Sequence, residues 1–328
     1  MTVIRFLHAA DLHLDSPFAE FSPPQAAEQR QLQRRLLKNM MALCRRRECD
    51  LLLLAGDIFD GMPYPETLEL LRHELSLCPV PVFLVPGNHD PLDSGIWDGS
   101  WPACVHIFRE PGSVELEDLG LCVHHGDVET LRAPQDGYLH IGLLHGDAPI
   151  SMEQIGATGL DYLAMGHIHK AALPRKAGET WYGWPGVTMG RGFDETGKKG
   201  VFLVELSKEV CRTEQIVLEA PRYESFTVAA GEPWEPPADS GEIRGRLHVV
   251  GQGDPLWAKS LHRRLEPQFL SLELVDETAP SRDLWADCGE GSLRGLALDA
   301  LRAHPDREQA SLAARFLLAA LEGRDAPW

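Results

Sequence analysis

The 328-residue sequence has no apolar run that approaches the roughly 18 residues of a membrane-spanning helix. Its first ten residues carry one arginine and then reach Asp11, without the layout of a cleavable secretion signal. These absences predict a cytoplasmic protein that does not associate with a membrane.

The sequence also lacks the cysteine spacing of common structural sites. Its seven cysteines form an odd set with no C-x-x-C pair. This pattern argues against a disulfide framework and against a cysteine-ligated zinc site. We therefore expect reduced, mostly buried thiols.

A surplus of positive charge is missing as well. The chain has 31 basic and 49 acidic residues, a net charge of −18. A protein that binds nucleic acid by itself normally shows a basic surplus. If nucleic acid is the substrate, metal ions, local basic patches or a partner protein must offset the repulsion.

What the sequence does contain is a pattern of alternating strands and helices. Its length allows roughly two domains, and we place the boundary near residue 220, between domains 1–220 and 221–328. Residues 1–220 read as an α/β domain, with strands at 3–8, 51–54, 80–85, 120–124, 138–145, 162–165 and 200–206 and helices at 23–47 and 66–77. The remainder is predicted to form strands at 223–229, 242–250 and 269–275 and helices at 256–265, 292–303 and 306–321.

Polar clusters follow several of these strands. Ligands of open α/β sheets collect at the carboxyl ends of the strands, where the loops converge. The sequence therefore predicts one site built from five distant clusters: Asp11-Leu12-His13, Gly56-Asp57-Ile58-Phe59-Asp60, Gly87-Asn88-His89-Asp90, His145-Gly146 and Gly166-His167-Ile168-His169.

The types of residue in these clusters suit a pair of divalent cations. Two such ions about 3.5–4 Å apart need a carboxylate that can offer one oxygen to each. Asp57, on a tight turn after a buried strand, fits that role. Asp11 and His13 can reach one ion together only if the backbone bends after the first strand.

The other proposed metal ligands lie further along the chain. His167 and His169 can be divided between the two ions, and His145 and the amide oxygen of Asn88 complete the coordination of the second ion. Imidazole, carboxylate and amide oxygen together suit manganese, iron or zinc better than calcium.

A phosphoester bond is the natural target of such a centre. The ions would lower the pKa of a bound water and supply hydroxide to a phosphorus atom. His89 adjoins Asn88 and can approach the phosphate without binding metal, so we assign it to protonate the leaving oxygen or to stabilise the phosphorane. Asp90 is expected to orient this imidazole.

The five clusters in this order resemble the calcineurin-like metallophosphoesterases, whose pattern is D-x-H, G-D-x-x-D, G-N-H-D/E, a lone histidine and G-H-x-H. Three segments, at 8–17, 56–60 and 190–197, are similar to SbcD-type DNA repair exonucleases, especially the YhaO-like branch. The resemblance covers residues 1–220 well and the remainder loosely.

The resemblance implies a fold, an activity and partners. The fold would be a four-layer α/β/β/α sandwich with a smaller α+β C-terminal capping domain. The activity would be manganese-dependent cleavage of DNA, by a dimer that works with an SbcC-like coiled-coil ATPase. By the same resemblance the catalytic histidine falls on His89, and the metal ligands fall on Asp11, His13, Asp57, Asn88, His145, His167 and His169.

Some assignments have a competitor. His124-His125-Gly126 mimics His145-Gly146, but His145 follows a cleaner apolar strand and precedes the G-H-x-H motif closely. We therefore take His124 and His125 as a surface pair or as residues behind the metal ligands. Asp60 either orients a neighbour or caps a helix.

Other polar and aromatic residues could contact a substrate. Arg191 lies in a glycine loop and could bind a backbone phosphate. Trp181 and Trp184 could stack on bases, although core packing is the better interpretation. The run 45–47 is basic but lies at a helix end, before the next strand, and so at the sheet end opposite the site.

Three hypotheses follow, with a DNA exonuclease or endonuclease first. A small-molecule phosphodiesterase or protein phosphatase with the same dinuclear core is the second, favoured by the acidic composition. A non-catalytic subunit that positions DNA or regulates an ATPase is the third. The two closing helices, with Leu312, Phe316 and Leu317, are the candidate surface for the ATPase, although packing of the last helix against its own domain is the better interpretation.

Overall fold

The computed structural model describes residues 3–146, 150–253, 256–280 and 283–321. The chain divides into two compact units, Met1–Ser225 with Asp239–Gly245, and Phe226–Ala238 with Arg246–Trp328. Within the described ranges, no helix is both long enough and apolar enough to cross a bilayer.

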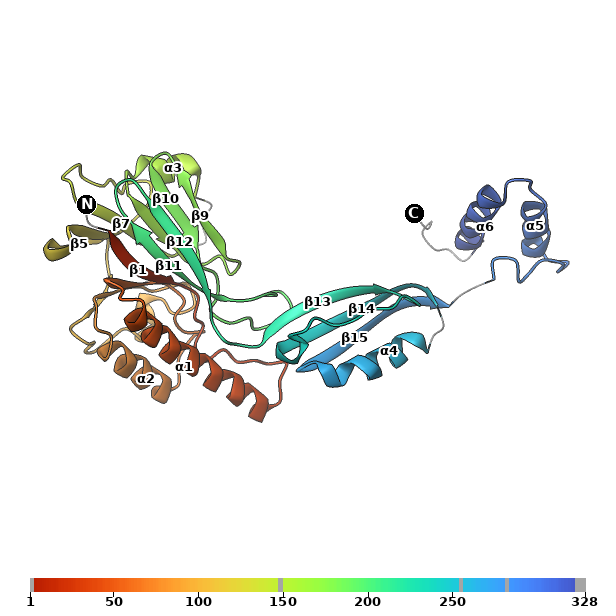
Figure 1. Ribbon diagram of the computed structural model, residues 1–328, viewed down its shortest axis with the longest axis horizontal. Helices are drawn as coiled ribbons and strands as arrows, with labels where there is room; N and C mark the ends of the chain where they lie inside the picture. Colours follow the sequence, from red (N-terminus) through yellow and green to blue (C-terminus); the bar gives the residue numbers. More distant parts are fainter. Residues whose placement is uncertain (1–2, 147–149, 254–255, 281–282, 322–328) are drawn as a thin grey trace. The chain divides into compact units, whose positions relative to one another are not determined.

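The first unit contains two six-stranded sheets (Figure 1). In the first sheet, β1 to β4 run parallel, and β11 and β12 add antiparallel strands beyond β1. The order is β12-β11-β1-β2-β3-β4, with bounds β1 Ile4–Ala9, β2 Leu51–Ala55, β3 Val82–Val85, β4 Val105–Ile107, β11 Gly200–Leu206 and β12 Cys211–Val217.

The second sheet has the order β5-β6-β7-β8-β10-β9. Its four inner strands are parallel, and its two edge strands, β5 and β9, are antiparallel to their neighbours. The bounds are β5 Gly112–Leu116, β6 Leu121–His125, β7 Leu139–Leu144, β8 Tyr162–Met165, β9 Ala172–Ala177 and β10 Thr180–Trp184.

Alternating side chains divide the interior into layers. Leu51 and Leu53 of β2 join the core between the two sheets, whereas Leu52 and Leu54 face the helices α1 (Pro23–Arg46) and α2 (Pro65–Ser76). Helix α3 (Met152–Ala157) contributes to a third core on the outer face of the second sheet. The unit is thus the α/β/β/α arrangement predicted from the sequence.

Helix α1 shows how local sequence sets an element. Ser22 is its N-cap, and the Ser22 backbone N–H donates to Oε1 of Gln25 at 3.2 Å. Leucine and methionine side chains at helical spacing, such as Leu36 and Met40, are buried against the first sheet. Arginines in its last turn, Arg45 and Arg46, complement the negative end of the helix dipole.

The second unit combines strands and helices. Its three-stranded sheet has the order β13-β14-β15, formed by Arg222–Ala229, Ile243–Gly253 and Ser271–Pro280, of which residues 222–225 and 243–245 are counted with the first unit. Helix α4 (Trp257–Leu265) packs on β15. Helices α5 (Leu293–Arg302) and α6 (Arg307–Leu321) pack against each other around buried Leu298, Ala314 and Leu318.

Candidate metal centre

Two backbone loops form the floor of the site. The N–H of Asp11 donates to the carbonyl of Gly56 at 3.0 Å, and the N–H of His13 donates to the carbonyl of Asp57 at 2.9 Å. Asp11, His13 and Asp57 have positive φ angles of 51°, 44° and 49°. Such left-handed residues cost about 1–3 kcal/mol each and persist where the surroundings hold them, often at functional sites. The backbone therefore makes the bend that Asp11 and His13 need to reach one ion.

Two motif glycines allow the loops to approach each other closely. A Cβ atom on Gly87 would lie 2.0 Å from Oδ1 of Asp57. A Cβ on Gly166 would lie 1.8 Å from the carbonyl oxygen of Ala55. Both contacts are far shorter than real carbon–oxygen contacts, so glycine is a geometric requirement at these positions.

One group of ligand atoms could hold a first cation. Carboxylate oxygens of Asp11 and Asp57 and ring nitrogens of His13 and His169 all lie within 4.8 Å of one another. The two imidazoles face each other, with 3.2 Å between their Nε2 atoms. Asp11, His13 and Asp57 are almost fully buried.

A second group lies beside it and shares Asp57. Oδ2 of Asp57 is 3.3 Å from Nε2 of His145. The side-chain oxygen of Asn88 lies 3.0 Å from the same nitrogen and 3.1 Å from Nδ1 of His167. The structure thus brings all seven predicted metal ligands together, in two groups joined by the carboxylate that was expected to bridge.

These residues fit a pair of divalent cations. Ring nitrogens, carboxylate oxygens and an amide oxygen converge on two small volumes, and this donor set suits manganese, iron or zinc. Two nearly buried carboxylates repel each other unless positive charge lies between them. The convergence of lone pairs therefore has a simple explanation in two bound cations.

Electrostatics of the site agree with this fit. Burial raises the pKa of Asp11 to about 6. Burial also raises the pKa of Asp57, but a hydrogen bond to His145 and its charge outweigh burial, so the net shift is downward. A hydrogen bond to Glu195 raises the pKa of His169. The carboxylates thus favour positive charge on His145 and His169, whereas burial lowers the pKa of His13.

His89 stands at the edge of the centre with a different partner from the one predicted. Its backbone N–H donates to Oδ1 of Asp57 at 2.9 Å, and its Nδ1 lies 2.8 Å from Oδ1 of Asp60. Its side chain is 41% exposed. Asp60, whose role the sequence left open, therefore orients this imidazole.

The prediction that Asp90 orients His89 is wrong. Asp90 is completely buried. Its Oδ2 accepts the backbone N–H groups of Ile58 and Phe59 at 2.8 and 2.9 Å. Its Oδ1 accepts the N–H of Gly87 at 2.7 Å. Asp90 therefore links the loop after β2 to the loop after β3, because its carboxylate accepts hydrogen bonds from backbone N–H groups of both.

A charged network connects the two sides of the site. Oε1 of Glu195 lies 2.8 Å from Nδ1 of His169 and accepts a 2.7 Å hydrogen bond from Arg191. Arg191 also donates to Oδ2 of Asp60 at 3.2 Å. The guanidinium of Arg191 thus lies beside the metal centre and binds the carboxylates of Asp60 and Glu195. The predicted contact between Arg191 and a phosphate stays a prediction. Glu195 was not singled out from the sequence, although it lies in the distinctive segment 190–197.

His124 and His125 lie apart from the metal centre. Both are in β6, where His124 is buried and its Nε2 lies 2.9 Å from Nδ1 of His140. Nδ1 of His125 lies 2.9 Å from the carbonyl oxygen of Leu143. The choice of His145 over this pair therefore agrees with the geometry.

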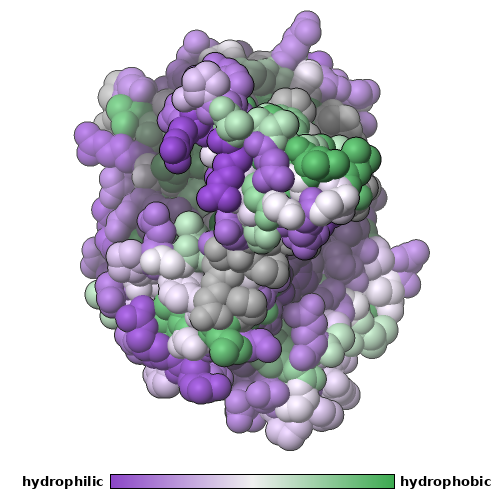
Figure 2. Space-filling model, turned by 90° about the vertical axis from the view of Figure 1, so that its right-hand side faces the viewer, coloured by the Kyte–Doolittle hydropathy of each residue, from purple (hydrophilic) through white to green (hydrophobic). Residues whose placement is uncertain are grey.

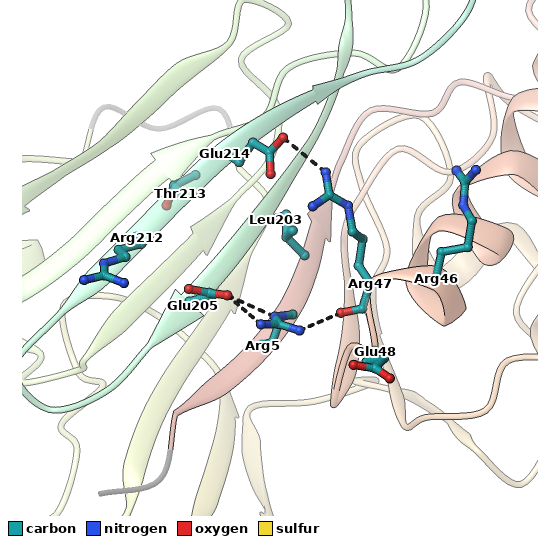
Figure 3. Close-up of a pocket in the computed structure, with 9 residues that line it drawn as sticks. All are labelled: Arg5, Arg46, Arg47, Glu48, Leu203, Glu205, Arg212, Thr213 and Glu214. Carbon is teal, nitrogen blue, oxygen red and sulfur yellow. Dashed lines mark hydrogen bonds and ion pairs between the residues drawn. The ribbon is translucent and has the colours of Figure 1, made fainter.

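The basic run at the end of α1 lies at the opposite end of the first sheet. Arg46 and Arg47 line a pocket of about 330 Å³ beside the first residues of β1 (Figure 3). Arg5 pairs with Glu205 at 2.7 Å there, and Arg47 pairs with Glu214 at 3.1 Å. Acidic partners thus offset much of the charge, and the pocket is separate from the metal centre.

Comparison with known proteins gives a family. The sequence profile of the calcineurin-like phosphoesterases matches residues 4–171. An uncharacterised metallophosphoesterase of Bacillus subtilis (strain 168), YhaO, is 32% identical over 257 residues, which are 67% of this chain and 62% of that protein. The chain therefore spans less than two thirds of the length of this relative.

The matches among solved structures are more distant. TT1561 of Thermus thermophilus is 13% identical with a TM-score of 0.42, over 65% of this chain and 99% of that one. A dimetal phosphatase of Danio rerio is 11% identical with a TM-score of 0.38, over 66% of this chain and 99% of that one.

Proposed function

The chain belongs to the calcineurin-like phosphoesterase family, and on this premise we propose that it is a manganese-dependent nuclease that cleaves phosphodiester bonds of DNA. Membership makes it a metal-dependent phosphoesterase. The observation that carries the proposal is the pair of ligand groups that share Asp57, with His89 beside them.

The residues divide the work of hydrolysis among them. Asp11, His13 and His169 would hold one cation, and Asn88, His145 and His167 the other, with Asp57 between them. Bound cations supply a nucleophile at neutral pH and neutralise charge on the phosphate.

His89 supplies the proton. Asp60 accepts from its Nδ1, which leaves Nε2 to donate to the oxygen that departs from phosphorus. Asp57 accepts the backbone N–H of His89 and so fixes this residue relative to the metal centre.

The exposure of the centre supports a polymeric substrate. Asn88 is exposed, the side chain of His89 is 41% exposed and that of His169 is 34% exposed. A phosphodiester in the middle of a long chain can reach such groups without its ends entering a cavity. The cations would offset part of the repulsion between DNA and a chain of net charge −18.

A cleavage assay tests this proposal. Purified protein with manganese is given linear and hairpin DNA, with His89→Ala as the matched variant that keeps the metal ligands. We expect cleavage by the wild type, none after chelation, and a loss of about 10²–10⁴-fold in rate in the variant. Intact DNA under conditions in which a chromogenic phosphodiester is hydrolysed would refute a DNA substrate.

A second candidate is a small-molecule phosphodiesterase or protein phosphatase. The net charge of −18 favours it, because a small substrate needs no basic track on the surface. Cyclic nucleotides and a phosphopeptide, assayed beside DNA at equal concentration, separate the two functions. Faster turnover of either small substrate than of DNA would decide for this candidate.

We also propose a partner, an SbcC-like coiled-coil ATPase, bound by a homodimer of this chain. Leu293, Leu296 and Leu312 on α5 and α6 are 80%, 60% and 52% exposed, and apolar side chains gather within a largely hydrophilic surface (Figure 2). Co-purification with an SbcC-like coiled-coil ATPase tests the partnership. Leu312→Glu should abolish it, whereas Ser311→Glu one residue away is the control.

A further inference from the structure

A second cluster of metal-binding side chains lies on the second sheet. Cys122 of β6 stands directly opposite His140 of the parallel strand β7, and His124 follows Cys122 by two residues. Side chains two residues apart on a strand point to the same face. All three therefore project from one face, the one opposite the core between the sheets, to which Val123 and Ile141 belong.

The distances within this cluster suit one cation. The three ligand atoms, one from each side chain, all lie within 4.8 Å of one another. Nε2 of His124 is 2.9 Å from Nδ1 of His140. Tetrahedral zinc places two nitrogens about 3.3 Å apart, and a sulfur and a nitrogen about 3.6 Å apart, given bonds of about 2.0–2.1 and 2.3 Å. A shift of a few tenths of an ångström would open the two imidazoles enough to admit the ion.

Two carboxylates complete the surroundings. Oδ1 of Asp136 lies 3.0 Å from Nε2 of His140. Metal-binding histidines commonly donate their second ring N–H to a carboxylate, which fixes the tautomer and raises the basicity of the ligating nitrogen. Glu115 of β5 stands opposite Cys122 in the antiparallel register, so it lies on the same face and could occupy a fourth position.

We propose that Cys122, His124 and His140 bind a single divalent cation of the zinc type, at a site separate from the dimetal centre. One thiolate and two imidazoles are the donors that zinc prefers. The three side chains are 4%, 8% and 1% exposed as residues. Such burial fits a structural site, in which the ion joins β6 to β7, better than a site that binds substrate.

The alternative is a chain of hydrogen bonds without metal. A proton on Nε2 of His124 would then be donated to Nδ1 of His140, which would donate from its Nε2 to Asp136. In that case the Cys122 thiol would have no role in the cluster. Coordination by sulfur is therefore what distinguishes the two arrangements.

Cobalt spectroscopy on the whole 328-residue chain reads sulfur coordination directly. None of the seven residues assigned to the dimetal centre is a cysteine, so a thiolate-to-cobalt charge-transfer band cannot come from that centre. Titration with Co²⁺ should give this band in the wild type, and Cys122→Ser should abolish it. Cys211→Ser, which removes a half-buried thiol in β12, is the matched control and should keep the band.

A second variant separates coordination from folding. Asp136→Asn changes an exposed residue that is not a ligand, so it should keep the band but weaken metal affinity about 10–100-fold. A wild-type protein without the band would overturn the proposal. So would a band that survives Cys122→Ser, because the thiolate would then belong elsewhere, for example to the buried cysteines 44, 49 and 78. Neither result depends on which phosphoester the enzyme hydrolyses.

Discussion

The pairing of Asp60 with His89 predicts a specific interaction between two substitutions. Oδ1 of Asp60 is 2.8 Å from Nδ1 of His89, so the carboxylate orients the imidazole that must donate a proton to the leaving oxygen. Asp60→Asn keeps the shape of the side chain but removes this charge. The variant should therefore hydrolyse a phosphodiester more slowly, with its metal content unchanged.

The size of the effect follows from the geometry. A hydrogen bond to a charged group, such as this 2.8 Å contact, contributes about 1.5–3 kcal/mol to holding its partner in place. Because the His89 side chain is 41% exposed, solvent screening keeps the interaction near the lower figure. A loss of about 1.5 kcal/mol lowers kcat roughly tenfold. His89→Ala removes the proton donor itself and should lower kcat by about 10²–10⁴-fold.

A double-mutant cycle makes this reasoning refutable. The assay is hydrolysis of a chromogenic phosphodiester at saturating manganese, with metal content measured for each variant. If Asp60 acts through the imidazole, Asp60→Asn should have almost no effect in the His89→Ala background. A further tenfold loss in that background would show that Asp60 acts in another way. Asp93→Asn, an exposed carboxylate nearby, controls for a general effect of charge.

Three further predictions concern the frame of the site. Gly166→Ala forces a Cβ atom against the backbone carbonyl of Ala55 in β2, so it should destabilise the protein by about 3 kcal/mol in thermal unfolding and lower its metal content. Gly146→Ala is the control: Gly146 has open space around it, so this variant should keep the stability and the metal content of the wild type. Glu195→Gln should weaken manganese affinity about 10–100-fold in a titration, because this carboxylate fixes one of the ligating imidazoles, while Asp194→Asn should leave it unchanged. Burial lowers the pKa of His8 to about 3, so below about pH 6.5 the unfolded chain binds a proton at His8 and the folded chain does not. In urea unfolding without metal, this group should therefore lower the free energy of unfolding by about 2 kcal/mol at pH 5 relative to pH 8. His8→Gln should remove that part of the pH dependence.

The metal ligands could be predicted because each depends on a local pattern. Asp11, Asp57 and Asn88 follow apolar strands at once, and parallel strands bring such positions to one edge of a sheet. Gly87 and Gly166 are explained equally locally, by the close approach of two loops. Pattern and spacing were therefore sufficient to predict that these side chains converge, with Asp57 common to two groups of candidate ligands.

The partners of these ligands could not be predicted in the same way. Asp60 and Asp90 both lie close to His89 in space or in sequence, and only the loop geometry shows that the buried Asp90 binds backbone N–H groups instead. Glu195 contacts His169, which lies 26 residues earlier in the sequence. Glu195 lies in a glycine-rich turn, and the pattern of apolar residues does not predict the path of such a turn. Contacts of this kind depend on tertiary structure.

Several strands were missed for a related physical reason. Strand β9 contains Pro174 and three exposed residues, and it lies at the edge of its sheet, where proline is tolerated and one side is solvated. Strands β4, β5 and β12 also lie at edges. Edge strands carry mixed polar and apolar side chains, so they lack the continuous apolar runs that revealed β2 and β3.

Anomalous diffraction from crystals grown with manganese tests the central claim most directly. Two peaks should flank the carboxylate of Asp57 about 3.5–4 Å apart, one within bonding distance of His13 and the other of His145. A single peak, or manganese bound without contact to Asp57, would contradict a dinuclear centre built on that residue.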